Sequence, residues 1–319
     1  MKTYNDIYLS TRNILRQNGV EGYALEARIL VACAAGKTVQ QLLRDINLYT
    51  TEQVENTVLD YTARRLRGEP VAYITGSWEF YGLPMTVTSD VLIPRMDTEV
   101  LVDAVKEFLT GYKMDARVLD LCCGTGTLTC EMTRRGYELI AVDASVDMLM
   151  QAQEKAAGLA PAPLFLCQEA GGLDLYGTVD AAYCSLDGIN YIPPAELPEL
   201  FHRLRLFIRP GGLWIFDLRS PQWLESMDGQ IYVDEQEDVL CLWRADLDRE
   251  NAAVTYGMDI FSRVGALWRR DCEEHVEYIH SFEALRRMLE AEGFTDVTLR
   301  CDGPQGGAGR QFVIAKRGS

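Results

Sequence analysis

The sequence has few of the features that mark membrane, secreted or nucleic-acid-binding proteins. Its longest apolar runs, such as residues 29–35, fall far short of the roughly 20 residues that a membrane span needs. The first residues are polar and offer no signal-peptide core, so we expect a cytoplasmic protein that does not enter a membrane. Basic residues are outnumbered, 31 Lys and Arg against 47 Asp and Glu, and the net charge of −16 argues against general binding of nucleic acid.

Disulfide and metal-binding patterns are lacking as well. The nine cysteines are an odd number, scattered along the chain with no Cys-x-x-Cys pair, and there are three histidines. We therefore expect no disulfide framework and no metal site. With 48% hydrophobic and 24% charged residues, the composition is that of a globular protein, and 319 residues are enough for two domains.

The first part of the chain has helical spacing. Apolar residues recur with helical periodicity in segments 3–18, 22–35, 38–44 and 52–67, which predicts a helical domain over residues 1–75. Alternation over residues 78–88 predicts a β-hairpin with Gly82 in its turn. Asp97 can cap a helix that ends at Gly111. Residues 76–115 are thus expected to be a hairpin and linker helix.

From residue 116 to residue 319 the pattern is strand, turn and helix, repeated. Short apolar strands are predicted at 118–121, 139–142, 164–167, 179–183 and 213–216, the last preceded by a turn at 209–212. Strands that alternate with helices favour an α/β fold with a mainly parallel sheet covered on both faces. Residues from about 229 to 279 alternate without helical spacing and predict an antiparallel insertion, and strands at 297–299 and 312–315 close the sheet.

A glycine turn after the first of these strands is the strongest candidate for a binding site. Asp120 precedes Gly124-Thr-Gly126, and Asp143 ends the next strand. Glycines let a ligand approach the main chain, and a carboxylate at the second strand's tip can accept two ribose hydroxyls. A dinucleotide stays open as the ligand, although its third glycine is replaced by Thr129 and Asp120 would repel a pyrophosphate. An amino group and a sulfonium suit Asp120 better.

This pattern resembles the S-adenosylmethionine (SAM) site of class I SAM-dependent methyltransferases, and the resemblance covers residues 116–319. It implies a Rossmann-like, mainly parallel seven-stranded sheet. In detail the region is similar to small-molecule methyltransferases, in which strands inserted after the fifth strand roof the active site. The cofactor contacts that we expect on these grounds are Asp120, Cys122, Gly124, Thr125, Gly126, Asp143, Ala144, Glu169, Ala170 and Cys184.

The N-terminal part resembles a different family, the release factor glutamine methyltransferases. Three segments carry the resemblance: Gly-Glu-Pro-Val-Ala-Tyr-Ile-Thr-Gly at 68–76, Glu-Phe-Tyr-Gly-Leu-Pro at 79–84 and Leu-Ile-Pro-Arg-Met-Asp-Thr-Glu at 92–99. The resemblance covers residues 1 to about 126 and implies that the helical domain helps to hold a peptide chain release factor. The family's Asn-Pro-Pro-Tyr motif, which holds the substrate amide, is missing. Its place is taken by Ser-Leu-Asp-Gly at 185–188, and serine does not offer an amide's paired donor and acceptor.

We therefore expect a SAM-dependent methyltransferase whose acceptor belongs to a release factor or is a small molecule. A non-catalytic SAM-binding fusion or chimera, joined at the shared glycine turn, is the alternative. Candidates for a base that takes a proton from the acceptor are Asp187, Glu274 and His275. His275 is expected to share a strand face with Arg269, Asp271 and Glu273.

Overall fold

The computed structural model describes residues 2–80, 83–87, 93, 97–109, 116–235, 238–301 and 309–319. Its chain divides into two compact units, residues 1–96 and 97–319. The expectations for Gly82, Gly111 and half of the segment 92–99 lie outside the described residues. In the parts of the chain that are described, no helix is long and apolar enough to cross a membrane.

The first unit is helical, as the spacing predicts. Thr3 and Thr38 begin α1 and α3 with a capping box, in which side chain and backbone satisfy each other's polar groups. Leu15, Ala27 and Leu30 are fully buried in one of its apolar clusters. A short helix, α5, was not predicted. The elements are α1 (Tyr4–Gln17), α2 (Tyr23–Ala34), α3 (Val39–Arg44), α4 (Glu52–Leu66), α5 (Val71–Thr75) and an antiparallel hairpin of β1 (Ser77–Phe80) and β2 (Leu83–Thr86).

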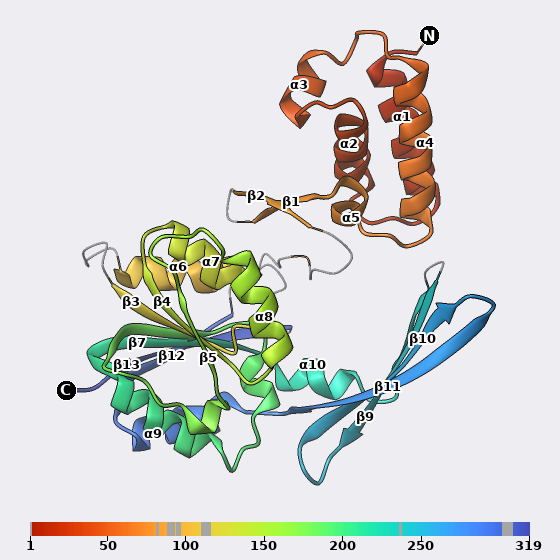
Figure 1. Ribbon diagram of the computed structural model, residues 1–319. Helices are drawn as coiled ribbons and strands as arrows, with labels where there is room; N and C mark the ends of the chain where they lie inside the picture. The colour runs from red at the N-terminus through yellow and green to blue at the C-terminus, as the bar shows by residue number, and fades with distance from the viewer. Residues whose placement is uncertain are drawn as a thin grey trace. The chain divides into compact units, whose positions relative to one another are not determined.

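The second unit is built on a seven-stranded sheet in the order β12-β13-β7-β6-β3-β4-β5. The strands are β3 (Arg117–Leu121), β4 (Glu138–Asp143), β5 (Leu164–Cys167), β6 (Val179–Cys184), β7 (Ile208–Arg219), β12 (Phe294–Arg300) and β13 (Arg310–Arg317). All pairs from β5 to β7 are parallel, while β13 is antiparallel to both of its neighbours. Figure 1 shows α6 and α7 on one face of the sheet and α9 on the other. The helices are α6 (Asp97–Leu109), α7 (Thr127–Arg134), α8 (Val146–Lys155), α9 (Leu197–Phe207), α10 (Pro221–Ser226) and α11 (Phe282–Ala291), with single turns η1 (Ala170–Gly172) and η2 (Gly188–Tyr191).

The strand order fixes where a ligand can bind. The chain starts at β3 and continues to β4 and β5 on one side, then returns to β6 and β7 on the other. Such a reversal opens a crevice at the carboxyl ends of the strands, here between β3 and β6. The core beneath it is apolar and includes the fully buried Leu119, Ala182 and Trp214.

A second, four-stranded antiparallel sheet lies after β7, in the region where the alternation predicts an insertion. It has the order β11-β10-β9-β8 and consists of β8 (Ile231–Glu235), β9 (Val239–Asp248), β10 (Ala253–Val264) and β11 (Leu267–Tyr278). Figure 1 shows it extending from the main sheet beside α10. Leu224 of α10 packs with Val254 and Tyr256 of β10 in a shared apolar cluster.

One local prediction is wrong. The turn expected at residues 209–212 is a bulge within β7. Val179 of β6 lies opposite Ile208, whereas Ala181 lies opposite Leu213, so β7 contains extra residues at this point. Gly211 has a φ of +76°, and a Cβ on Gly212 would meet the Asp180 carbonyl oxygen at 2.7 Å. The two glycines therefore allow the strand to bend without leaving the sheet.

Candidate functional site

The glycine turn after β3 lies at the β3–β6 crevice. Cys122, Gly124 and Gly126 all have left-handed backbone, with φ of +60°, +53° and +66°. A Cβ on Gly124 would meet no atom within 4 Å, so the main chain there is open to a ligand. A Cβ on Gly126 would lie 2.8 Å from the Ala152 Cβ of α8. Gly126 is thus required for the close packing of α7 and α8, and Gly124 is the glycine that a ligand can approach.

Asp143, at the tip of β4, is half-buried and faces this turn. Its Oδ2 accepts a hydrogen bond from the Gly124 N–H at 2.8 Å, and its Oδ1 accepts one from the Ser145 N–H at 2.9 Å. Each carboxylate oxygen has further acceptor capacity. The carboxylate therefore braces the turn and can still receive ligand hydroxyls.

Asp120 lies beneath the turn, 1% exposed. The Thr129 hydroxyl of α7 donates to its Oδ2 at 2.5 Å, while its Oδ1 has no hydrogen-bond partner in the described structure. Burial, aided by the charge of Asp143, raises the pKa of Asp120 to about 7, against the opposing interactions with the hydroxyls of Thr129 and Tyr183. A positively charged donor next to Oδ1 would restore its ionised form.

Replacing Asp120 by asparagine is expected to stabilise the ligand-free protein while weakening its binding of SAM. Because the folded-state pKa lies above the unfolded value, Asp120 costs stability progressively as the pH rises from about 4 to about 7, and the cost persists above that range. Asp120→Asn removes this cost, about 2–4 kcal/mol at pH 8. Urea unfolding at pH 5 and pH 8, with SAM titration by calorimetry, measures both effects. A variant that is no more stable at pH 8 than the parent would contradict this prediction.

The remaining residues expected to contact the cofactor gather at the same edge. Ala144 is exposed beside Asp143, and the Gln168 N–H donates to the Asp143 carbonyl at 3.1 Å, which holds the segment after β5 against β4. Glu169 is exposed and precedes Ala170 in η1. Two further residues of this predicted set also have a place in the protein's own structure. The Thr125 hydroxyl accepts from Lys155 Nζ at 3.0 Å, and Cys184 is fully buried at the end of β6.

These features fit SAM. The open main chain at Gly124 gives room for a close approach. The unpaired Asp120 Oδ1 suits an amino group, and the half-exposed Asp143 carboxylate suits two adjacent hydroxyls. In the described residues, no group of three His, Cys, Asp or Glu is placed to hold a metal ion.

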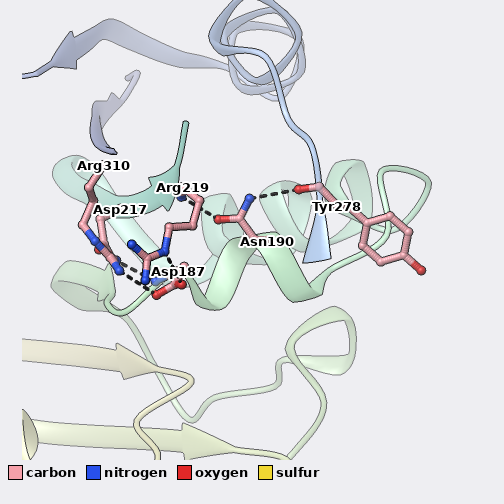
Figure 2. Close-up of polar contacts among 6 residues, drawn as sticks. All are labelled: Asp187, Asn190, Asp217, Arg219, Tyr278 and Arg310. Carbon is pink, nitrogen blue, oxygen red and sulfur yellow. Dashed lines mark hydrogen bonds and ion pairs between the residues drawn. The ribbon is translucent and has the colours of Figure 1, made fainter. Parts of the chain in front are cut away.

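The loop after β6, where the acceptor would lie, is fixed by buried charges. Leu186 and Asp187 both have a φ of +60°, a costly conformation for residues other than glycine. Asp187 accepts from Arg219 Nε and from Arg310 Nη2, each at 3.0 Å, and Arg310 also pairs with Asp217 (Figure 2). The four charged side chains are at most 10% exposed and sum to zero charge. Asp187 is therefore held in an ion-pair network.

Both polar atoms of the Asn190 side-chain amide, on η2, form hydrogen bonds within the protein. Its Oδ1 accepts from the Arg219 N–H at 2.8 Å, and its Nδ2 donates to the Tyr278 carbonyl at 2.9 Å (Figure 2). This side chain is buried and ties the loop to β7 and β11. It is not free to hold a substrate amide.

The other two candidate bases lie on opposite faces of β11. His275 is paired across the sheet with Tyr256, and Glu274 with Gly257, so their side chains alternate. The His275 ring lies edge-on to Tyr191 of η2, with centroids 6.5 Å apart, and its Nε2 is 3.4 Å from Glu273. The structure thus brings His275 beside the loop after β6 and places Glu274 on the other face of the sheet.

Sequence reasoning missed Glu277. It lies two residues beyond His275 on the same face of β11, is 6% exposed, and its Oε2 has no hydrogen-bond partner in the described structure. The alternation that led to His275 would have reached Glu277 at the next step. Burial of that end of the strand has no signal of its own in the sequence.

Two family models match the chain. One, described as a methyltransferase domain, matches residues 118–212, and the other, described as the PrmC N-terminal domain, matches residues 6–76. The chain is 31% identical over 286 residues to a release factor glutamine methyltransferase of Burkholderia pseudomallei, which covers 88% of each protein. It is 30% identical over 183 residues to a putative methyltransferase of Bacillus subtilis, YqeM, covering 56% of this chain and 73% of that protein. A release factor glutamine methyltransferase of Haemophilus influenzae is 33% identical over 158 residues, and the match spans about half of that protein, 54%.

Solved structures share the fold of the second unit. A SAM-dependent methyltransferase from Clostridium acetobutylicum aligns with a TM-score of 0.61 and 24% identity, covering 72% of this chain and 94% of that one. The sugar N-methyltransferase KedS8 from Streptoalloteichus aligns with a TM-score of 0.59 and 20% identity, covering 74% and 99%. At these identities the likeness is one of fold. It confirms the Rossmann-like α/β fold with a mainly parallel seven-stranded sheet.

Proposed function

The chain belongs to the release factor glutamine methyltransferase family. Within that family, we propose that it transfers the methyl group of SAM to an acceptor other than the glutamine amide for which the family is named. It is a SAM-dependent methyltransferase, related to these enzymes over most of its length. The proposal concerns the acceptor and the residues that act on it.

The observation that carries the proposal is the state of the loop after β6. The chain has Ser-Leu-Asp-Gly at 185–188 in place of Asn-Pro-Pro-Tyr. Asp187 is committed to Arg219 and Arg310, and the nearby amide of Asn190 is committed to the backbone. An amide nitrogen is a poor nucleophile and depends on being held in one orientation. In the described structure of this loop, no side-chain amide is free to hold it.

The proposed cofactor site is the glycine turn and its surroundings. The Asp143 carboxylate would hold the ribose hydroxyls, the main chain at Gly124 would line the cofactor, and Asp120 would face its amino group. Glu169 and Ala170 would lie on the adenine side, and Cys184 with Cys122 below the sulfur. When bound, SAM supplies an electrophilic methyl group, and the chain's own task is to align the acceptor and exclude water.

Glutamine methylation of a release factor is the second candidate. It is favoured by the match of residues 6–76 to the PrmC N-terminal domain and by the similarity to the Burkholderia enzyme over 88% of the chain. On this alternative, the helical unit would bind the release factor, and the acceptor would be held without the family's motif.

Two other expectations from the sequence stay predictions. They are the domain division at 75/76 and 115/116 and the join between two parental sequences.

Incubation with SAM and a purified release factor separates the two candidates. We expect the factor to keep its mass, because the loop has no free amide holder, while calorimetry shows that the protein binds SAM. A release factor glutamine methyltransferase that carries Asn-Pro-Pro-Tyr, assayed in parallel, must add one methyl group to the same factor. A methylated glutamine produced by this protein would establish the second candidate. Failure to bind SAM would end both candidates, and with them the alternative of a non-catalytic SAM-binding protein.

A further inference from the structure

Glu277 forms a polar cluster with Tyr256, which is buried, and with Tyr191, which is 48% exposed. Tyr256 lies on β10, directly opposite His275 of β11, and Glu277 lies directly opposite Val254. Because residues two positions apart share a face of a strand, Tyr256 and Glu277 are on the same face of the sheet. Glu277 is 6% exposed and Tyr256 is 8% exposed. The Glu277 Oε2 and the Tyr256 hydroxyl are both without a hydrogen-bond partner in the described structure. Buried polar atoms are rarely left unpaired, since each costs free energy, so this cluster is a place where a ligand can supply the missing partner.

The surroundings of Glu277 set its charge near neutral pH. Burial raises the pKa of Glu277 to about 7, with a further contribution from the negative charge of Asp187. The charges of Arg219 and Arg310 and a hydrogen bond from the Tyr191 hydroxyl act in the opposite direction. The group can therefore gain or lose a proton in the physiological range, unlike an exposed glutamate.

The cluster lies on the acceptor side of the crevice. Tyr191 belongs to η2, which begins directly after Asp187 and follows β6, one of the two strands that border the crevice. β11 is anchored to η2 by the bond from Asn190 to the Tyr278 carbonyl, one residue beyond Glu277 (Figure 2). Glu277 is thus carried by the inserted sheet to the loop at which the reacting atoms of a methyl acceptor would lie.

We infer that Glu277, with the hydroxyls of Tyr191 and Tyr256, holds the nitrogen of an amine acceptor. The inference rests on the proposed methyl transfer and assigns the class of its substrate. A carboxylate bordered by two aromatic rings suits a cationic group better than a neutral amide. It also lies where positive charge develops on nitrogen during the reaction.

The step balances with the groups already named. The amine binds as an ammonium ion and first passes one proton to the carboxylate of Glu277, which frees its lone pair. The nitrogen then uses this lone pair to form the N–C bond to the methyl group, while the C–S bond breaks and its electron pair stays on sulfur. The methylated nitrogen keeps the positive charge and leaves as an ammonium ion, and the proton on Glu277 passes to water. Nothing is oxidised or reduced, and no further reactant is needed.

Binding of simple amines to the protein saturated with S-adenosylhomocysteine tests the inference. The probes are benzylamine and cyclohexylamine, with benzyl alcohol and cyclohexanol as uncharged counterparts of the same shape, each titrated by calorimetry at pH 6.5. We expect the amines to bind, the alcohols to bind at least tenfold more weakly, and amine binding to release protons to the buffer as Glu277 ionises. Glu277→Gln should weaken amine binding at least tenfold and abolish the proton release.

Glu273→Gln is the matched control, because Glu273 lies on the same face of β11 but its side chain is 55% exposed. It should bind the amines like the parent. Glu277→Asp keeps the charge and should recover part of the affinity if Glu277→Gln perturbs the fold. Equal amine affinity in the parent and Glu277→Gln, equal affinity for amines and alcohols, or no amine binding by the parent would each overturn the inference. Binding of S-adenosylhomocysteine is measured first, so its absence would count against the proposed function instead.

Discussion

Replacing Asp143 by alanine is expected to lower the affinity for SAM by a factor on the order of 100 or more. Each hydrogen bond from a ribose hydroxyl to a carboxylate contributes about 1.5–3 kcal/mol, and two are lost together. The same carboxylate braces the turn through the Gly124 and Ser145 N–H groups, so the turn also loses its support. Isothermal titration calorimetry with SAM measures the effect directly.

The control for this change is Asp147→Ala. Asp147 is an exposed acid in the first turn of α8, four residues from Asp143. Its replacement by alanine removes the same charge but leaves the glycine turn after β3 unchanged. It should bind SAM with the parent's affinity. Melting curves of both variants report whether the fold is kept. An Asp143→Ala protein that is folded and binds SAM as tightly as the parent would refute the assignment of Asp143 to the ribose.

Replacing Arg310 by methionine is expected to destabilise the second unit by about 3–5 kcal/mol, the usual cost of leaving a buried charge without its partner. Arg310 is 1% exposed and pairs with both Asp187 and Asp217. Without it, two buried carboxylates share the single cation Arg219. Urea unfolding followed by the fluorescence of the tryptophans measures the loss.

The loss should depend on pH in a definite direction. Burial and the charge of Asp187 already raise the pKa of Asp217, and Arg310 opposes this. In Arg310→Met the pKa rises further above its unfolded value, so the folded state binds more protons, and stability falls as the pH rises through that window. The deficit should be larger at pH 8 than at pH 5. Lys316→Met on the same strand removes a half-exposed pair with Asp296 and should cost no more than about 1 kcal/mol at either pH. A deficit that does not change between these pH values would contradict the role given to Arg310.

The parts of the site that sequence could predict are those encoded within a short stretch of chain. Asp120, Gly124 and Asp143 belong to one strand–turn–helix–strand segment, and the spacing of apolar residues and glycines places them at one sheet edge. Even here a role was missed. The ligand contact of Gly126 stays a prediction, and a Cβ on this residue would also meet Ala152 of α8, which no local pattern reveals.

The parts that sequence could not predict depend on distant contacts. Asp187 was named as a candidate base, which stays a prediction, and its ion pair with Arg310 joins residues 123 positions apart. Nothing near Asp187 in the sequence indicates that partner. Glu277 was overlooked for a related reason. The alternation of β11 tells which residues share a face, but the packing of α10 and η2 decides which end of that face is buried.

The position of β13 also has a consequence for how the protein is made. This strand comes last along the chain, yet in the sheet it lies between β12 and β7 and brings Arg310 to the loop after β6. During synthesis, Asp187, Asp217 and Arg219 emerge long before Arg310, the second guanidinium of this network. A nascent chain that stops short of residue 310 therefore holds two buried carboxylates with one cation, and the loop after β6 can reach its final form only when almost the whole chain has been made.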